Sequence, residues 1–256
     1  MNLTAASAIV TGGAGGLGAA TVRHLVGLGV GVVIFDLDGE RAKSLAAELG
    51  PTTTAVSGDV TVDADVASAI DAARELGTLS IVANVAGGGT RPARTVGRDG
   101  APHDLATFVG TLAKNTVGTF NVTRLAAAAM AANTPDEDGQ RGVVVNTGSL
   151  AGLEGQAGQV AYAAAKAAIL GMTLPLARDL APLGIRVCGI APGTIGTDLM
   201  LSASQQLKDK LVATIVFPHR MGRPAEFALL VEAIIRNPYL NGENIRLDAA
   251  QRFPAK

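Results

Sequence analysis

Tyr162 and Lys166 lie four residues apart in the segment Tyr-Ala-Ala-Ala-Lys. In an α-helix, residues at positions i and i+4 share one face, so the phenol and the ammonium group can face the same pocket. A free tyrosine has a pKa of about 10 and is a poor base at neutral pH. A neighbouring ammonium group favours the phenolate and lowers that pKa. The spacing therefore predicts a proton-transfer pair, and the alternative is a half-buried tyrosine beside a surface lysine.

A glycine-rich segment predicts a dinucleotide site. Residues 11–18 read Thr-Gly-Gly-Ala-Gly-Gly-Leu-Gly and separate an expected strand from an expected helix. Glycines let the backbone approach a pyrophosphate closely, and the helix N-terminus offers N–H donors and a positive dipole end. Asp36 closes the next expected strand, where a carboxylate would accept hydrogen bonds from the ribose hydroxyls. Because a carboxylate repels a 2′-phosphate and the glycine-rich segment contains no Arg or Lys, we expect NAD(H) rather than NADP(H).

The elements that position these residues alternate along the chain. Apolar runs predict strands at 7–11, 31–35, 54–57, 79–83, 142–147, 185–190 and 244–247. Helical patterns cover 17–29, 41–49, 62–76, 105–132, 159–180 and 227–235. This alternation predicts an α/β fold, a single Rossmann-type doubly wound parallel sheet with helices on both faces. Ligands of such sheets bind beyond the carboxyl ends of the strands.

The domain organisation follows from this pattern. We expect one dinucleotide-binding catalytic domain over residues 1–256, because no linker divides the alternating elements. Residues 193–223 follow a strand and contain a short amphipathic piece. Long irregular segments in compact domains are usually functional or mobile, so we expect a substrate lid there. The alternative is a solvent-exposed excursion without a role in binding.

Composition excludes several classes of function. The chain is 48% hydrophobic and 17% charged with a formal net charge of −1, which is typical of a folded domain and gives no basic surface for nucleic acid or anionic membranes. Cys188 is the only cysteine and the three histidines are scattered, so we expect no metal site and an inert core thiol. No signal-peptide pattern and no uncharged apolar run of membrane-spanning length is visible. We therefore expect a cytoplasmic protein.

Further residues complete a family pattern. In chain order they are Thr11-Gly-x-x-x-Gly16-x-Gly18, Asp59, Asn84-x-Ala86-Gly87, Asn115, Ser149, Tyr162-x-x-x-Lys166 and Pro192-Gly193. With this order and spacing the chain resembles the short-chain dehydrogenase/reductase family over almost its whole length. The resemblance implies that the catalytic set is Ser149, Tyr162, Lys166 and Asn115, with Asn115 holding a water that links Lys166 to solvent. It also implies that the NAD contacts are Gly12, Gly15, Gly16, Leu17, Gly18, Asp36, Asp59, Val60, Asn84, Ala86, Gly87, Tyr162, Lys166, Pro192, Gly193 and Ile195.

A narrower group matches in four more segments. Residues 139–147, 153–159, 171–182 and 240–248 are similar to the type-II 3-hydroxyacyl-CoA dehydrogenases, also known as type-10 17β-hydroxysteroid dehydrogenases. This resemblance implies NAD-dependent oxidation of a 3-hydroxyacyl-CoA to a 3-ketoacyl-CoA, with substrate contacts at Ser149, Gln156 and Tyr162. It also implies a homotetramer. One departure is Asp248-Ala249-Ala250, where the wider family usually has Asp-Gly-Gly.

Three alternatives remain at this point. The same catalytic set could serve an NAD-dependent hydroxysteroid dehydrogenase or another secondary-alcohol dehydrogenase. A ketoreductase acting on acyl-carrier-protein substrates would usually use NADPH and carry a basic residue near Asp36, which this sequence lacks. A catalytically inactive cofactor sensor or scaffold would be expected to lose Tyr162, Lys166 or Ser149. The sequence leaves the acyl chain length and the direction of the reaction open.

Overall fold

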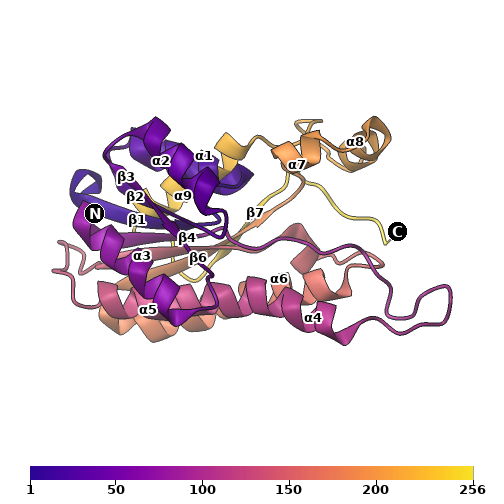
Figure 1. Cartoon of the computed structure of the whole chain (residues 1–256), viewed down its shortest axis with the longest axis horizontal. Helices are drawn as coiled ribbons and strands as arrows, with labels where there is room; N and C mark the ends of the chain where they lie inside the picture. Colours follow the sequence, from indigo (N-terminus) through magenta and orange to yellow (C-terminus); the bar gives the residue numbers. More distant parts are fainter. Residues whose placement is uncertain (256) are drawn as a thin grey trace.

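Seven parallel strands form the centre of the protein in the computed structural model, which describes residues 1–255. Their spatial order is β3-β2-β1-β4-β5-β6-β7, and the chain crosses from β3 back to β4 next to β1 (Figure 1). The bounds are β1 Ala6–Thr11, β2 Gly31–Asp36, β3 Thr53–Ser57, β4 Thr78–Asn84, β5 Gly142–Thr147, β6 Ile185–Pro192 and β7 Asn244–Leu247. The predicted α/β class with a doubly wound parallel sheet is confirmed.

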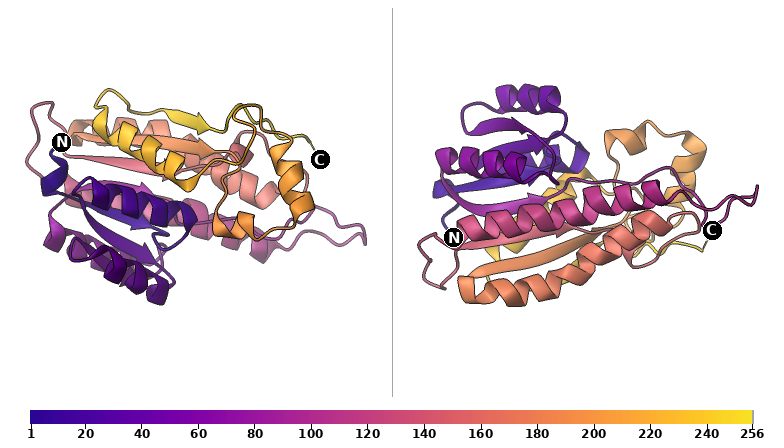
Figure 2. Two further views of the ribbon diagram at one scale, coloured as in Figure 1. Left: turned by 90° about the horizontal axis from the view of Figure 1, so that it is seen from above. Right: turned by 60° about the horizontal axis from the view of Figure 1, so that its bottom comes forward.

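Helices cover both faces of the sheet (Figures 1 and 2). One face carries α1 (Gly16–Gly27), α2 (Gly39–Leu49) and α9 (Pro224–Arg236). The other carries α3 (Asp63–Leu76), α5 (Gly118–Met130) and α6 (Val160–Leu180), with α4 (Leu105–Leu112) packed on α6. Because helices cover both faces, β1, β5 and β6 are buried at every residue and read as continuous apolar runs rather than alternating ones.

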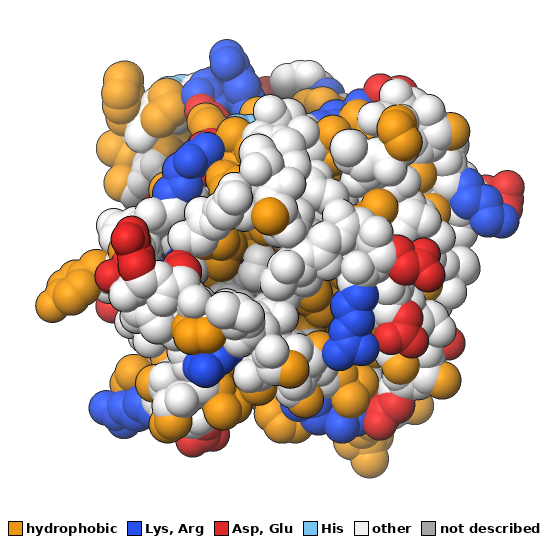
Figure 3. Space-filling view, turned by 90° about the vertical axis from the view of Figure 1, so that its left-hand side faces the viewer, with side chains coloured by type: hydrophobic (Ala, Val, Ile, Leu, Met, Phe, Trp, Pro, Cys, Tyr) orange, Lys and Arg blue, Asp and Glu red, His pale blue; other side chains and the backbone are white. Residues whose placement is uncertain are grey.

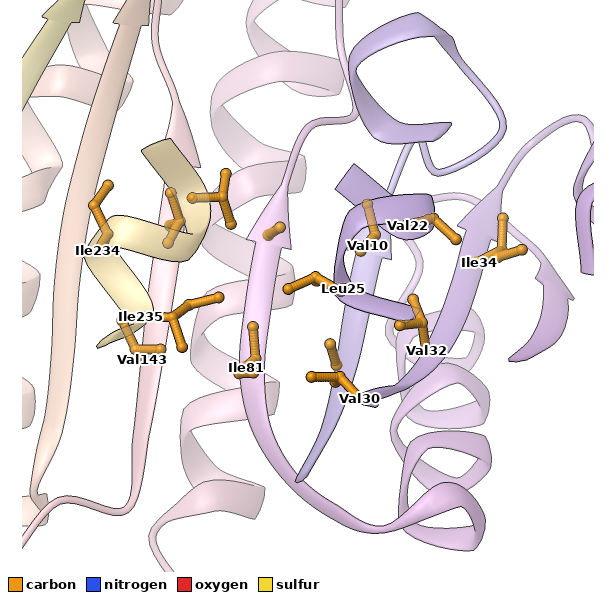
Figure 4. Close-up of a cluster of buried hydrophobic side chains, with 14 of the residues drawn as sticks. Val10, Val22, Leu25, Val30, Val32, Ile34, Ile81, Val143, Ile234 and Ile235 are labelled. Atoms are coloured by element: carbon orange, nitrogen blue, oxygen red, sulfur yellow. The ribbon is translucent and has the colours of Figure 1, made fainter. Parts of the chain in front are cut away.

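Two hydrophobic cores hold the sheet between its helices. On the first face, Val22 and Leu25 of α1 and Ile234 of α9 pack toward the strands, as Figure 4 shows. On the second face, Val122 and Met130 are among the residues that fill the space under α3 and α5. All five side chains have no exposed surface. Burying an aliphatic side chain of this size contributes about 1.5–3 kcal/mol, so the strands are firmly held and their carboxyl ends form a rigid platform.

The helix expected over residues 105–132 is interrupted. A π-helical turn, Ala113–Val117, separates α4 from α5, and the Gly118 N–H bonds to the carbonyl of Ala113, five residues back. Such a turn inserts one residue without breaking the helical hydrophobic pattern, so it cannot be recognised in the sequence. The extra residue rotates the helix locally and leaves Asn115 completely buried.

The irregular segments gather at one end of the molecule. Figure 1 places the loop after β4, the helices α7 (Asp198–Leu201) and α8 (Gln205–Val212), and the C-terminal residues together at this end. Short 3-10 turns at Leu3–Ala5, Leu150–Gly152 and Ala181–Leu183 complete the secondary structure. The opposite end, shown in Figure 3, carries acidic and basic side chains interspersed. The segments expected to contact a ligand therefore lie on the same side of the protein.

One helical stretch is unusually long and apolar. Residues 160–183, which comprise α6 and the following 3-10 turn, are long and apolar enough to cross a membrane by length and composition alone. In this fold α6 packs on β6 and contains Lys166, which is buried. The apolar composition of this stretch is accordingly that of a helix packed on the sheet.

Candidate active site

A cleft of about 600 Å³ opens beyond the carboxyl ends of β1, β2 and β4. Eleven of the residues predicted to contact the cofactor line it: Gly12, Gly15, Gly16, Leu17, Gly18, Asp36, Asp59, Val60, Ala86, Gly87 and Tyr162. They come from α1, β2, α6 and the turns that follow β1, β3 and β4, and only the fold brings them together. This position is where dinucleotides bind to doubly wound sheets.

The glycine turn after β1 has the shape of a phosphate cradle. Gly12 has φ of +61°, and a Cβ there would lie 2.9 Å from the Cα of Ala86. A Cβ on Gly18 would overlap the carbonyl oxygen of Gly12. Helix α1 begins at Gly16, and no side chain caps it. Its first N–H groups consequently face the cleft as donors, together with the positive end of the helix dipole.

Asp36 and Asp59 line the cleft at the ends of β2 and β3, where each carboxylate fixes a backbone turn. The Asp36 carboxylate accepts hydrogen bonds from the N–H groups of Ala14 (2.9 Å) and Asp38 (3.0 Å), so it also fixes the glycine turn. An ionised carboxylate offers about four acceptor positions, which leaves room for ribose hydroxyls. Asp59 accepts from the N–H and the hydroxyl of Thr61, both at 2.8 Å, and thereby shapes the turn into α3.

The structure brings Ser149, Tyr162 and Lys166 together. The Lys166 ammonium lies 5.8 Å from the centroid of the Tyr162 ring and donates to the carbonyl of Thr147 at 2.8 Å. Ser149 starts the turn Leu150–Gly152, and its hydroxyl accepts from the Ala151 N–H at 3.1 Å. A Cβ on Gly152 would lie 2.7 Å from the Lys166 backbone, so glycine allows this turn to pack directly on α6. The Ser149 hydroxyl reaches the Tyr162 phenol as a hydrogen-bond partner.

The protonation of this pair differs from the sequence-based prediction. Burial raises the pKa of the Tyr162 phenol above its ordinary value, and the hydrogen bond with Ser149 only partly opposes this effect. The net shift is therefore opposite to the predicted one, because burial outweighs any stabilisation of the phenolate by Lys166. Burial, and secondarily the charge of Lys114, lowers the pKa of Lys166 to about 8. Both charged forms are disfavoured because both groups have left water, and the neutral phenol is the stable form of Tyr162.

Asn115 is completely engaged with backbone groups. Its amide nitrogen donates to the carbonyls of Thr111 (2.9 Å) and Gly88 (3.1 Å), and its oxygen accepts from the Gly88 N–H at 3.0 Å. A Cβ on Gly87 would overlap this oxygen. The side chain thus anchors the backbone that follows β4 and lines the cleft. The water relay implied for Asn115 stays a prediction.

Six other predicted residues lie outside the lining of the cleft. The amide of Asn84 donates to Thr123 and Asn146 at the end of the sheet. The Gly193 N–H, next to Pro192, donates to the carbonyl of Leu247 at 2.9 Å, and Ile195 packs against Gly222. Lys166 lies behind Tyr162, and Gln156 donates to the Pro254 carbonyl at 3.2 Å. Their roles toward a ligand remain predictions.

Sequence reasoning missed other residues of the cleft. Phe35, Leu37, Gly58, Val85, Gly88, Lys114 and Thr197 also line it. The side chain of Thr197 reaches so near the glycine turn that a Cβ on Gly16 would lie 2.7 Å from its methyl group. Lys114 directly precedes the predicted site residue Asn115, and this adjacency could have indicated that Lys114 lines the cleft. Thr197 carried no such signal, because its contact with Gly16 spans most of the chain.

The part of the chain that the structure describes shows neither a metal site nor a reactive thiol. Within residues 1–255, no group of three or more His, Cys, Asp or Glu side chains could hold a metal ion. Cys188 has no exposed surface, and burial raises the pKa of its thiol. A buried thiol with a raised pKa is a poor nucleophile, which agrees with the core role expected for it.

A glycine cradle beside a buried Ser-Tyr-Lys set defines an oxidoreductase site of the doubly wound α/β class. The chain belongs to the short chain dehydrogenase family, whose sequence model matches residues 6–208. It shares 48% identity with the human protein named 3-hydroxyacyl-CoA dehydrogenase type-2, over 96% of this chain and 95% of that one. The protein of that name from Drosophila melanogaster is 46% identical, with coverage of 97% and 98%.

The fold agrees with a solved structure of the same name. The crystal structure of 3-hydroxyacyl-CoA dehydrogenase type-2 from Mycobacterium avium matches with a TM-score of 0.98 at 50% identity. The match covers 99% of this chain and 98% of that one. The family resemblance seen in the sequence, and its narrower form, are both confirmed.

Proposed function

We propose that this protein is an NAD-dependent dehydrogenase that interconverts 3-hydroxyacyl-CoA and 3-ketoacyl-CoA. The observation that carries the proposal is the buried Ser149, Tyr162 and Lys166 set at the end of a glycine-lined cleft. Relatives that share close to half of their residues over nearly the whole chain bear the name of this activity. The site supports the type of reaction, and the relatives support the substrate class.

The cleft fits a nicotinamide dinucleotide. The uncapped start of α1 and the glycine turn would hold the pyrophosphate, and Asp36 would accept from the adenosine ribose hydroxyls. Around Asp36 the cleft is lined by Phe35, Leu37 and Gly58, and none of them could neutralise a 2′-phosphate. These donors and acceptors favour NAD(H) over NADP(H). When bound, NAD supplies hydride transfer.

The protein residues then handle the proton and the reacting oxygen. The Tyr162 phenol, neutral at rest, donates a proton to the oxygen of a 3-keto group during reduction. The Ser149 hydroxyl bonds the same oxygen and keeps it within reach of the phenol. In the direction of oxidation Tyr162 must act as phenolate, and the neighbouring Lys166 ammonium stabilises that charge as it forms. Ser149 and Lys166 are buried, whereas Tyr162 lines the cleft and is half-buried, so a substrate bound there would keep bulk water from the phenol.

The substrate assignment can be tested by an assay of NADH formation. We expect turnover of 3-hydroxybutyryl-CoA and of a longer 3-hydroxyacyl-CoA, with a hydroxysteroid as the comparison substrate. Absence of turnover with both CoA esters, together with turnover of the hydroxysteroid, would replace the leading assignment by a hydroxysteroid dehydrogenase. Absence of turnover with all substrates despite tight NADH binding would indicate a cofactor sensor.

We further propose that residues 193–223 act as a substrate lid. Its helix α8 contains no buried residue, so little apolar packing holds it in place. Thr197, within the same segment, lies on the glycine turn at the edge of the cleft. Hydrogen exchange of α8 should slow when NADH and a substrate analogue bind together. Unchanged exchange would show that the segment is a surface excursion.

A homotetramer is a second proposal of this kind. Apolar side chains are exposed along the outer side of α4 and α5: Leu105, Val109, Val117 and Phe120. A separate site near α9 exposes Leu229 and Tyr239, the latter at 97%. Two distinct apolar surfaces are what a tetramer with two kinds of two-fold contact needs. Phe120→Glu should lower the mass measured by light scattering; a wild-type monomer would refute the proposal.

The cytoplasm is the location that we propose. The proposed substrates and cofactor are intracellular metabolites in chemical class, and the single buried cysteine suits a reducing compartment. Cell fractionation with a tagged chain tests this, and recovery with membranes or organelles would contradict it.

A further inference from the structure

Gln251 is completely buried although it lies five residues from the last residue of the chain. Its amide oxygen accepts from the Thr194 N–H at 2.9 Å. Its amide nitrogen donates to the hydroxyls of Thr214 (2.7 Å) and Thr194 (3.0 Å) and to the carbonyl of Leu211 (3.3 Å). Both polar atoms are therefore satisfied away from water, an arrangement that disfavours any displacement of the amide.

The partners of Gln251 belong to two distant parts of segment 193–223. Thr194 lies at its beginning, just after β6, whereas Leu211 and Thr214 lie at and just after the end of α8. A Cβ on Gly193 would lie 2.7 Å from the amide oxygen, so glycine permits the approach. One buried side chain thus closes the base of the segment, while α8 itself buries nothing.

Residues 248–255, here called the C-terminal strap, then cross to the other side of the site. The Phe253 N–H donates to Glu154 at 3.0 Å, and the Ala157 N–H donates to the carbonyl of Ala255 at 3.2 Å. Gln156 donates to the Pro254 carbonyl. These bonds fasten the strap to the loop that links Ser149 to Tyr162. Glu154 is itself fixed by Arg246 at 2.9 Å and Arg252 at 3.3 Å.

We propose that Gln251 is a positioning residue that holds the two walls of the substrate site at a fixed separation. One wall is the loop after Ser149, and the other is the base of segment 193–223. The strap joins them, and the Gln251 amide is its anchor. This inference rests on the proposed role of those walls in substrate binding. The glycine turn and Asp36, which would hold the pyrophosphate and the adenosine ribose, share no hydrogen bond with the Gln251 amide, so this part of the cofactor site is independent of the anchor. Gly193, a predicted cofactor contact, instead packs directly on the amide oxygen.

Gln251→Leu tests the anchor, because leucine keeps most of the volume and removes every hydrogen bond. We expect the KM of the substrate to rise about tenfold, which is the effect of losing bonds of this kind. The kcat should stay within about threefold, because Tyr162 and Lys166 keep their own contacts. The dissociation constant of ADP-ribose, which lacks the nicotinamide, should be unchanged because the glycine turn and Asp36 do not bond Gln251, and amide exchange over residues 205–214 should become faster.

Two further variants separate positioning from general destabilisation. Asn133→Ala removes an amide that bonds the carbonyls of Leu79 and Arg141 at the opposite end of the sheet, and it should leave the KM unchanged. Glu154→Gln weakens the other end of the strap at a partly exposed position, and it should raise the KM in the same direction. If Gln251→Leu does not fold, Glu154→Gln decides the question.

Two results would overturn the proposal. The first is an unchanged KM in a folded Gln251→Leu protein, or in Glu154→Gln where the former is unstable. The second is a parallel loss of ADP-ribose affinity, which would mean that the whole site, including the glycine turn and Asp36, has loosened. The KM is measured with whichever alcohol the wild type oxidises. A failure of the acyl-CoA assignment is therefore seen in the wild type and is distinct from a failure of the anchor.

Discussion

The cofactor side and the substrate side of the site are built in different ways. On the cofactor side, glycine turns and helix ends present backbone groups to the cleft, and Asp36 holds the turn through the Ala14 N–H, only 22 residues away. On the substrate side, side chains join segments that are far apart: Glu154 receives the Phe253 N–H across 99 residues, and Gln251 reaches Thr194 across 57. The cofactor side therefore depends on short glycine-containing motifs. The substrate side depends on single side chains, which can be replaced one at a time.

The difference explains how one scaffold can keep its reaction and vary its substrate. Glycines of the cradle cannot be replaced without a clash, as the positions of Gly12 and Gly18 show. The strap and segment 193–223 tolerate other residues provided that each buried polar atom keeps a partner. The Ser149, Tyr162 and Lys166 set lies where the two sides meet: Tyr162 lines the cofactor cleft, and Ser149 and Tyr162 are the predicted substrate contacts. Four changes test this division.

Tyr162→Phe has the largest expected effect, because it removes the hydroxyl that we propose as the acid at the reacting oxygen. Turnover should fall about 10²- to 10⁴-fold, the usual contribution of general acid–base catalysis. NADH binding should stay unchanged, because the cradle is built from backbone. Steady-state kinetics and a fluorescence titration with NADH measure the two quantities. Substantial residual activity would exclude Tyr162 as the acid/base.

Asp36→Ala should affect the cofactor side alone. Loss of the carboxylate should weaken NADH binding about tenfold, a typical value for hydrogen bonds to a charged group, and should relax discrimination against NADPH. The KM of the alcohol should not change. Asp38→Ala is the matched control, because Asp38 caps α2 through the Arg41 N–H and does not line the cleft. A wild type that prefers NADPH would contradict the role of Asp36.

Lys166→Met should reveal how much the burial of the Lys166 ammonium group lowers the stability of the folded protein. Lys166 has a pKa of about 8 in the folded protein, against 10.5 for the ordinary side chain. Between these values the unfolded chain binds more protons, so stability rises with pH and the burial penalty is largest below pH 8. From pH 7 to pH 9.5 the wild type should gain about 2 kcal/mol relative to Lys166→Met.

Denaturant unfolding at the two pH values measures this difference. Changes elsewhere in the chain, such as ionisation of Cys188, are common to both proteins and cancel. Lys43→Met, at an exposed lysine of α2, serves as the control and should show no such dependence on pH. Parallel pH profiles for the wild type and Lys166→Met would show that Lys166 is not perturbed by burial.

Ala249→Gly and Ala250→Gly have the smallest expected effect and lie on the substrate side. Both alanines adopt left-handed backbone conformations, with φ of 49° and 58°. Such a conformation costs an alanine about 1–2 kcal/mol, so each glycine should stabilise the protein by about 1 kcal/mol. Thermal unfolding measures this gain. The control Ala47→Gly, at an exposed position of α2, should have the opposite sign, and a loss of stability in all three variants would refute the strain.

Most of the fold could be predicted because its signals are local. The strand Gly142–Thr147 and the strand Asn244–Leu247 were predicted to the residue, and most other boundaries lie within one or two residues. The π-helical turn Ala113–Val117 was not foreseen, since one inserted residue leaves the apolar pattern intact. The pKa of Tyr162 was predicted in the wrong direction. A spacing of four residues shows that a lysine is near, but it does not show that both groups are buried.

The sequence by itself determined the class of fold, the glycine turn and the proximity of Tyr162 to Lys166, because each depends on residues that are close in the chain or repeat with a regular period. Only the tertiary structure decided what surrounds them. It placed Thr197 against Gly16 and gave the Asn115 amide hydrogen-bond partners on the backbone. It also buried Gln251 against the base of segment 193–223. Contacts of this kind join residues with no pattern between them, and they exist only after the chain has packed.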